Sequence, residues 1–158
     1  MEFIKYTILI FLTFILQSWS AEFFTLGTID PDFCVIVLLY ISIKNGGVTG
    51  TLFGFFIGLF IDFSSGTNQF FGLTPLIYTT TGYFCSYLKG ANEKLNKIYF
   101  TSIWVIIVMI QFLIFSLIVY QYLLIQNPIQ FLVKWLATSL YTLVFLGIFQ
   151  IMAPLHKV

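Results

Sequence analysis

The chain of 158 residues is 59% hydrophobic and 8% charged, with a net charge of +1 and a mean hydropathy of +1.00. Soluble domains carry about 25% charged residues, and a water-soluble core of this size could not hide so much apolar surface, so lipid must surround most of the chain. The near-neutral charge without a basic patch argues against a nucleic-acid partner. Cys34 and Cys85 form no C-x-x-C pair, so we expect neither a metal nor another cofactor.

The first predicted element is a transmembrane helix from about Phe3 to Ala21. A spanning helix needs about 20 mostly apolar residues, which this segment supplies. Lys5, the short apolar run after it and the Ser-Trp-Ser-Ala sequence at 18–21 faintly resemble a signal peptide with its cleavage site. Because Glu2 opposes Lys5 and further apolar segments follow, we expect an uncleaved first helix.

The second element, from about Pro31 to Ile43, is too short for a full crossing. It would span roughly 20 Å, whereas the hydrocarbon core is about 30 Å thick. Asp30 is the expected N-cap, Pro31 suits the first helical position, and Asp32 favours the positive end of the helix dipole. The irregular backbone at 25–29 would then lie at membrane depth, where it must be covered by protein or line a wet cavity.

The third element, from about Gly46 to Phe63, follows a tight turn at Lys44–Gly47. Small residues and one acid recur there at every fourth position and share one helix face: Gly46, Gly50, Gly54, Gly58 and Asp62. In membranes a face of small residues lets another helix approach closely. We expect this glycine row to make a helix contact within the chain, with a partner interface as the alternative.

Three further apolar elements complete the chain. They run from about Leu73 to Leu88, from about Ile98 to Ile125 and from about Ile129 to Met152. The first of them is the most polar, so we expect it inside the bundle, and Gln111 and Gln150 are expected to form hydrogen bonds between helices. The longest polar stretch, 89–97, is short. Residues 1–158 are therefore predicted to form a single transmembrane domain.

The lysines predict the orientation, because cytoplasmic loops are enriched in Lys. With six crossings and the N-terminus inside, every lysine except Lys134 falls on the cytoplasmic side, and Glu22, Asp30, Asp32 and Asp62 fall outside. A five-crossing chain would put one end on the wrong side of this pattern. We therefore expect an all-α membrane protein, a six-helix transmembrane bundle with both termini cytoplasmic and a short second helix.

Asp32 and Asp62 are expected at similar depth, roughly 18 and 22 Å from the turn at Lys44–Gly47. Together with Asp30 they would form a polar outer pocket. Asp30 and Asp32 could instead be helix caps, and Asp62 could accept a hydrogen bond from the backbone of the following turn at 64–66.

An intramembrane aspartyl enzyme would use Asp32 and Asp62 as a pair that shares a proton. Neither acid lies in a Gly-x-Gly-Asp or Asn-x-x-Asp motif, and the chain has no Arg to stabilise an oxyanion. We therefore expect no catalytic residue.

Motifs in the first half of the chain follow an order typical of a known family. They are Pro31-Asp32-Phe33, the glycine row, Gly58-Leu59-Phe60-Ile61-Asp62, Gly66 and Phe71-Gly72-Leu73. In this order they resemble the rod shape-determining protein MreD family. The motifs cover about Pro31 to Leu88, the length and six-span layout extend the resemblance to the whole chain, and the last two helices match only as apolar spans.

This resemblance implies a non-enzymatic component of the bacterial cell-elongation machinery in the cytoplasmic membrane. Proteins of this kind bind the bitopic protein MreC, and together the two link MreB filaments to the wall synthases RodA and a class B penicillin-binding protein. The residues that the resemblance singles out are Pro31, Gly46, Gly50, Gly54, Gly58, Asp62, Gly66 and Gly72.

The MreD family is also distantly similar to the substrate-binding subunits of energy-coupling-factor vitamin transporters. That similarity implies a compact six-helix bundle with a pocket opening outward, and it leaves an alternative function as a small-molecule-binding subunit of a transporter. Such subunits usually carry an Ala-x-x-x-Ala face on the first helix. Here no alanine precedes Ala21, which counts against the alternative.

Overall fold

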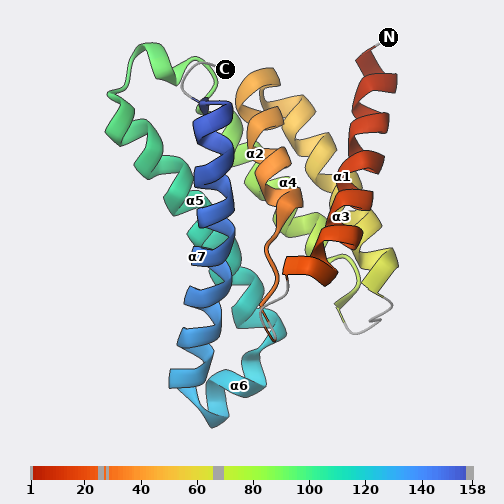
Figure 1. Cartoon of the computed structure of the whole chain (residues 1–158), viewed down its shortest axis with the longest axis vertical. Coiled ribbons are helices and arrows are strands. Elements are labelled where there is room, and N and C mark those ends of the chain that lie inside the picture. Colours follow the sequence, from red (N-terminus) through yellow and green to blue (C-terminus); the bar gives the residue numbers. More distant parts are fainter. Residues whose placement is uncertain (1, 25–26, 28, 66–69, 156–158) are drawn as a thin grey trace.

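The computed structural model describes residues 2–24, 27, 29–65 and 70–155, and their regular structure is helical (Figure 1). The long helices are α1 (Glu2–Phe24), α2 (Phe33–Asn45), α3 (Gly47–Ser65), α4 (Leu73–Ser86), α5 (Lys97–Val119) and α7 (Pro128–Met152). Two short elements join them, the 3-10 turn η2 (Ala91–Glu93) and the helix α6 (Gln121–Gln126). The prediction of an all-α chain is confirmed for these residues.

Among the residues that the structure describes, three helices are long and apolar enough to cross a membrane. The spanning segments are Gly47–Ser64, Lys97–Val119 and Pro128–Ile151. Shorter apolar helical segments run over Ile8–Trp19 and Phe33–Asn45. The second of these is α2, which has 13 residues and is short, as its sequence predicts. The chain therefore has the helices of a membrane protein.

The start of α2 corrects the predicted cap. Asp32, and not Asp30, is the N-cap: its Oδ1 accepts a hydrogen bond from the backbone N–H of Val35 at 3.1 Å. Helix α2 begins at Phe33, so Pro31 precedes the cap and does not occupy the first helical position. The physical reason is that the Asp32 side chain reaches an N–H group of the first turn that has no partner within the helix.

The turn between α2 and α3 forms where the sequence places it. Helix α2 ends at Asn45, and α3 begins at Gly47. Gly46 between them has a φ of 93° and donates its N–H to the Ser42 carbonyl at 2.9 Å. This left-handed conformation favours glycine and reverses the chain in a single residue.

The predicted fifth helix is not continuous. Helix α5 ends at Val119, and Tyr120 leaves the helical conformation with a φ of −107° and a ψ of 26° before α6 begins. The break turns the chain toward α7, where the Nζ of Lys134 lies 3.9 Å from the centre of the Tyr120 ring. This cation–π contact stabilises the chain at the break, and the apolar sequence of the segment does not predict it.

The predicted fourth helix, from Leu73 to Leu88, is slightly shorter in the structure, because helix α4 ends at Ser86.

The glycine row of α3 lies against α4. A Cβ atom added to Gly54 would lie 2.7 Å from the carbonyl carbon of Tyr78, and one added to Gly58 would lie 2.6 Å from the Cα of Pro75. A Cβ at Gly50 would lie 2.9 Å from the carbonyl oxygen of Gly82. These distances are shorter than side-chain contacts allow, so any larger residue would push the two backbones apart. Gly46 contacts the Lys89 side chain instead.

Helix α2 occupies the middle of the bundle. Most of its side chains are buried, and Cys34, Val35, Leu38 and Leu39 are 0% exposed. Figure 1 shows α1 and α3 to one side of it and α5 and α7 to the other. Its buried hydrophobic residues lie on all sides of the helix, so α2 is a core helix. The start of α2 is therefore surrounded by the neighbouring helices.

Candidate functional site

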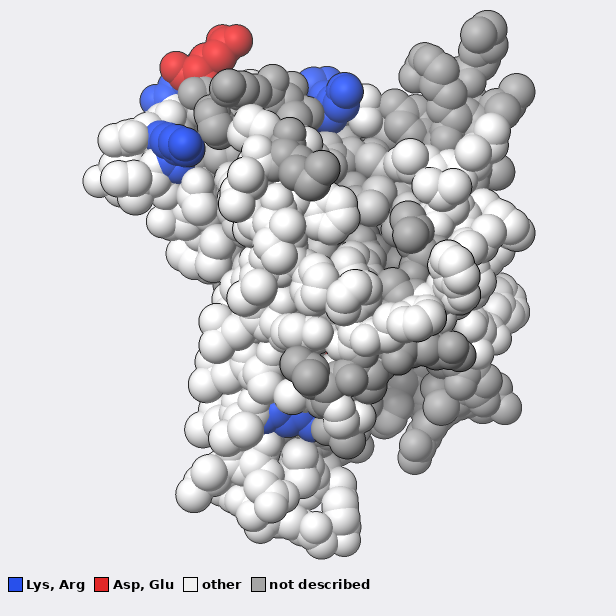
Figure 2. Space-filling view, in the orientation of Figure 1, with Lys and Arg blue, Asp and Glu red and all other residues white. Residues whose placement is uncertain are grey.

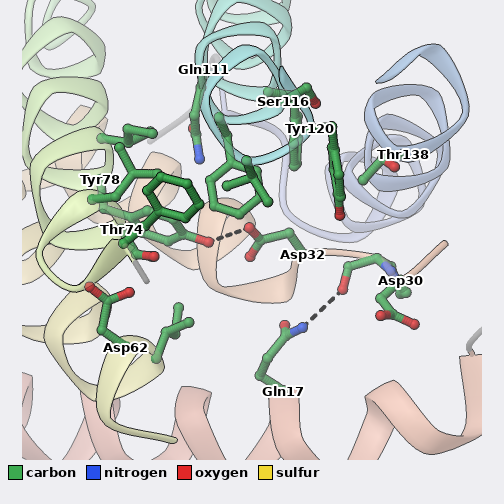
Figure 3. A pocket seen from close by; sticks show the side chains of 18 residues that line it. Gln17, Asp30, Asp32, Asp62, Thr74, Tyr78, Gln111, Ser116, Tyr120 and Thr138 are labelled. Atoms are coloured by element: carbon green, nitrogen blue, oxygen red, sulfur yellow. Dashed lines mark hydrogen bonds between the residues drawn. The ribbon is translucent and has the colours of Figure 1, made fainter. Parts of the chain in front are cut away.

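A cavity of about 440 Å³ lies where α2 and α4 begin and α3 ends. The polar side chains of its lining are Gln17, Asp30, Asp32, Asp62, Thr74, Tyr78, Gln111, Ser116, Tyr120 and Thr138 (Figure 3). They come from α1, α3, α4, α5, α7 and the segments next to these helices. All the acids that the sequence assigns to a polar outer pocket therefore line one cavity. It lies toward the end of the bundle opposite the Gly46 turn.

Asp32 connects three helices at this cavity. Its Oδ2 accepts a hydrogen bond from the hydroxyl of Tyr78 on α4, and its Oδ1 caps α2. Its backbone N–H donates to the Oγ1 of Thr142 on α7 at 3.1 Å. Tyr78 and Thr142 are 4% and 0% exposed and Asp32 is half-buried, so both bonds are partly buried. A carboxylate held in this way is fixed in position relative to the cavity.

Gln17 on α1 holds the backbone on both sides of Asp32. Its Nε2 donates to the Pro31 carbonyl at 3.1 Å, and its Oε1 accepts from the Phe33 N–H at 2.8 Å. One amide thus satisfies two backbone groups at the start of α2. Gln17 is not among the site residues that the sequence predicts, and its only signal there is that it is an amide within the apolar run of the first helix.

Asp62 closes the connection between α3 and α4. Its Oδ2 accepts a hydrogen bond from the backbone N–H of Gly72 at 2.6 Å, and Gly72 is the N-cap residue of α4 with a φ of 94°. Asp62 therefore accepts a hydrogen bond from the backbone, and this donor lies ten residues further along the chain. Of the family-motif residues, Gly66 lies outside the described residues.

Asp30 and Gln111 also line the cavity but are held differently. The Asp30 side chain is exposed, and no described residue donates a hydrogen bond to its carboxylate. Gln111 is only 4% exposed, and its Oε1 has no hydrogen-bond partner among the described residues. The expectation that Gln111 bonds to a neighbouring helix is therefore not met. Figure 3 shows its amide pointing into the cavity.

A metal site finds no support in this arrangement. Among the residues that the structure describes, no group of three His, Cys, Asp or Glu side chains could hold a metal ion. Cys34 and Cys85 are both buried free thiols. The cavity therefore offers carboxylates, hydroxyls and amides to a ligand, together with an apolar wall.

The chain matches a known protein family. The model of a family described as rod shape-determining protein MreD matches residues 1–155. The match extends over α5 and α7, which carry none of the sequence motifs. No curated protein and no solved structure matches the chain.

Proposed function

Because the chain belongs to the family of the rod shape-determining protein MreD, we propose that it is a non-enzymatic membrane scaffold of the bacterial cell-elongation complex. In this role it binds MreC and helps to control cell shape and peptidoglycan synthesis. The observation that carries the proposal is the match over nearly the whole chain. The hydrogen bonds of Asp32 and Asp62 to structural partners favour a scaffold over an enzyme.

We further propose six crossings of the bacterial cytoplasmic membrane, made by α1, α2, α3, α4, α5 and α7, with both termini in the cytoplasm. Figure 1 shows both termini at the same end of the molecule, which supports an even number of crossings. Figure 2 shows Lys side chains gathered at that end, with one blue group far from it. Since lysines favour the cytoplasmic side, that end is the cytoplasmic one in this proposal.

For MreC, the proposed binding site is an outer face of the bundle and not the glycine row. The row is covered by α4, so a partner helix would have to displace a contact within the chain. Apolar side chains face outward from α5 at Ile106, Ile110 and Ile114, and from α7 at Leu140 and Val144. MreB, RodA and a class B penicillin-binding protein would be reached indirectly, through MreC.

Co-purification with MreC tests this proposal directly. Tagged full-length chain is extracted in a mild detergent and is expected to retain MreC. Two variants then locate the contact, each with a photo-crosslinking amino acid at one outward position. The positions are Ile110, which is 49% exposed, and Leu140, which is 54% exposed. Val108 and Ser139 are both 0% exposed and give matched buried controls on the same helices. Loss of MreC in detergent, together with no adduct at any outward position, would overturn MreC binding.

Depletion tests the role in cell shape. A rod-shaped host that loses the chain is expected to become round, and expression of the chain is expected to restore the rods. A host that remains rod-shaped after depletion would contradict the morphogenetic role.

The cavity favours a second function, that of a small-molecule-binding membrane subunit. Its volume of about 440 Å³ lies within the range of ligand pockets, which is about 300–1,000 Å³. Binding of a ligand is compatible with the scaffold role, because the cavity and the outer faces are different surfaces.

A further inference from the structure

The cavity is acidic without an internal counter-charge. Asp30, Asp32 and Asp62 line it, and no Lys does so among the described residues. Lys134 lies over the Tyr120 ring, at 3.9 Å from its centre, and makes no ion pair with a described acid. Carboxylates inside a membrane protein are costly unless a cation or a polar group compensates them. The cavity therefore favours a positively charged occupant.

A second observation points to a hydrogen-bonding ligand. Gln111 is 4% exposed, lines the cavity, and leaves its Oε1 without a partner among the described residues. A buried amide oxygen that lacks a donor is destabilising, and a ligand that supplies the donor removes this cost. Figure 3 shows this amide directed, with its nitrogen end, into the space that Tyr78 and Asp32 also face. Because the amide can turn about its terminal bond, either its oxygen or its nitrogen can face a ligand.

The rest of the wall is apolar and aromatic. It includes Leu73, Ile77, Phe112 and Phe115, with the ring of Tyr120. Aromatic faces attract cations and also pack against hydrocarbon. A ligand that fits this lining has a positive, hydrogen-bond-donating end and an apolar body.

We propose that the cavity binds a primary ammonium group carried on a small apolar body. An ammonium group has three N–H donors and no acceptor, which matches a lining that offers the Asp32 and Asp62 carboxylates and the unpartnered Gln111 Oε1 as acceptors. Asp30, exposed at the cavity, adds attraction for the incoming cation. This ligand site is independent of the MreC contact.

Binding of phenethylamine to the purified full-length chain tests the proposal. The amine is positively charged at neutral pH, and isothermal titration in detergent is expected to show saturable binding. Phenethyl alcohol has the same ring and chain length without the charge, and phenylpropionate carries the opposite charge. Both are expected to bind at least about tenfold more weakly. Equal binding of the alcohol, or no binding of the amine, would overturn the proposal.

Variants then locate the site. Asp62→Asn keeps an oxygen that can accept from the Gly72 N–H, so the loop stays closed while one charge is lost. Gln111→Leu removes the unpartnered amide. Each variant is expected to weaken phenethylamine binding about tenfold. Glu93→Gln in η2, which lies outside the cavity, is the charge-matched control and is expected to bind as the unaltered chain does. If Glu93→Gln weakens phenethylamine binding as much as Asp62→Asn does, the amine binds outside the cavity and the proposal is overturned.

Nanodiscs distinguish two sources of the ammonium group. Phosphatidylethanolamine carries a primary ammonium head group, whereas phosphatidylcholine does not. If phosphatidylethanolamine reduces the apparent affinity for phenethylamine relative to pure phosphatidylcholine, the natural ligand is a lipid head group. If the affinity is the same in both membranes, the ligand is a free amine. Both results require the amine to bind in pure phosphatidylcholine, and failure to bind in that membrane counts against the site.

Discussion

The hydroxyl of Tyr78, in the middle of α4, donates a hydrogen bond to the Oδ2 of Asp32 at the start of α2. Both residues line the cavity, and Tyr78 is 4% exposed. This bond joins the core helix to the helix that packs on the glycine row. It also compensates part of a buried carboxylate.

Tyr78→Phe is expected to lower the free energy of unfolding by about 1–3 kcal/mol, because a buried carboxylate loses its hydroxyl donor while the ring remains. Thermal or chemical unfolding of the purified chain in detergent measures the change. Tyr99→Phe is the matched control, since Tyr99 is 67% exposed on α5. Equal stability of the two variants would show that the Tyr78 bond contributes nothing.

Gly54→Leu is expected to separate α3 from α4 and to destabilise the fold by about 1–3 kcal/mol or more. The leucine side chain would overlap the backbone of Tyr78, because a Cβ atom at position 54 would already lie 2.7 Å from the Tyr78 carbonyl carbon. Gly147→Leu is the control, because a Cβ at Gly147 meets nothing within 4 Å. The yield of folded protein after size-exclusion chromatography and its unfolding midpoint provide the comparison. Tolerance of leucine at Gly54 would contradict the close approach.

Gln17→Leu is expected to release the backbone before α2. The Pro31 carbonyl and the Phe33 N–H each lose their partner, at a cost of about 1–3 kcal/mol for each buried group. Hydrogen exchange followed by mass spectrometry is expected to show faster exchange at the Phe33 amide. Gln121→Leu changes an exposed amide on α6 and is expected to leave that exchange rate unaltered. Unchanged exchange at Phe33 in the Gln17 variant would contradict the role of the amide.

Single cysteines test the proposed orientation. Cys34 and Cys85 are 0% exposed, so they give little background for a membrane-impermeant maleimide. Gln126→Cys, at the end of α6, is expected to react from outside the intact cytoplasmic membrane. Lys94→Cys, next to η2, is expected to react only after the membrane is opened. The reverse pattern would place the lysine-rich end outside and contradict the proposed arrangement.

The parts of the structure that follow from the sequence depend on local patterns. The glycine row predicts a close helix contact because residues four apart share a face, and the structure places α4 against it. The helical rise alone brings Asp32 and Asp62 to similar depth, and both line the cavity. Such inferences need only the geometry of one helix or of two helices joined by a tight turn.

The parts that do not follow depend on side chains meeting across the bundle. Nothing in the periodicity of α1 or α7 indicates that Gln17 and Thr142 bond to the segment around Asp32. The break at Tyr120 has no Gly or Pro to mark it, and it coincides with a contact to Lys134. Acids lie on both sides of Pro31 in the sequence, and only the hydrogen bond from the Val35 N–H shows that Asp32 and not Asp30 is the N-cap.

The bond from the Asp32 N–H to Thr142 joins residues 110 positions apart. During synthesis α3 and α4 can associate as soon as both have left the ribosome, because they are neighbours in the chain. Gln17 on α1 and Tyr78 on α4 are made earlier, but the Asp32 N–H receives its acceptor Thr142 only when α7 emerges, near the end of translation. The acidic cavity therefore lacks part of its wall until α7, the last helix, is in place. A chain truncated before α7 would leave the Asp32 segment incompletely bonded, and we expect the cell's quality-control proteases to degrade it.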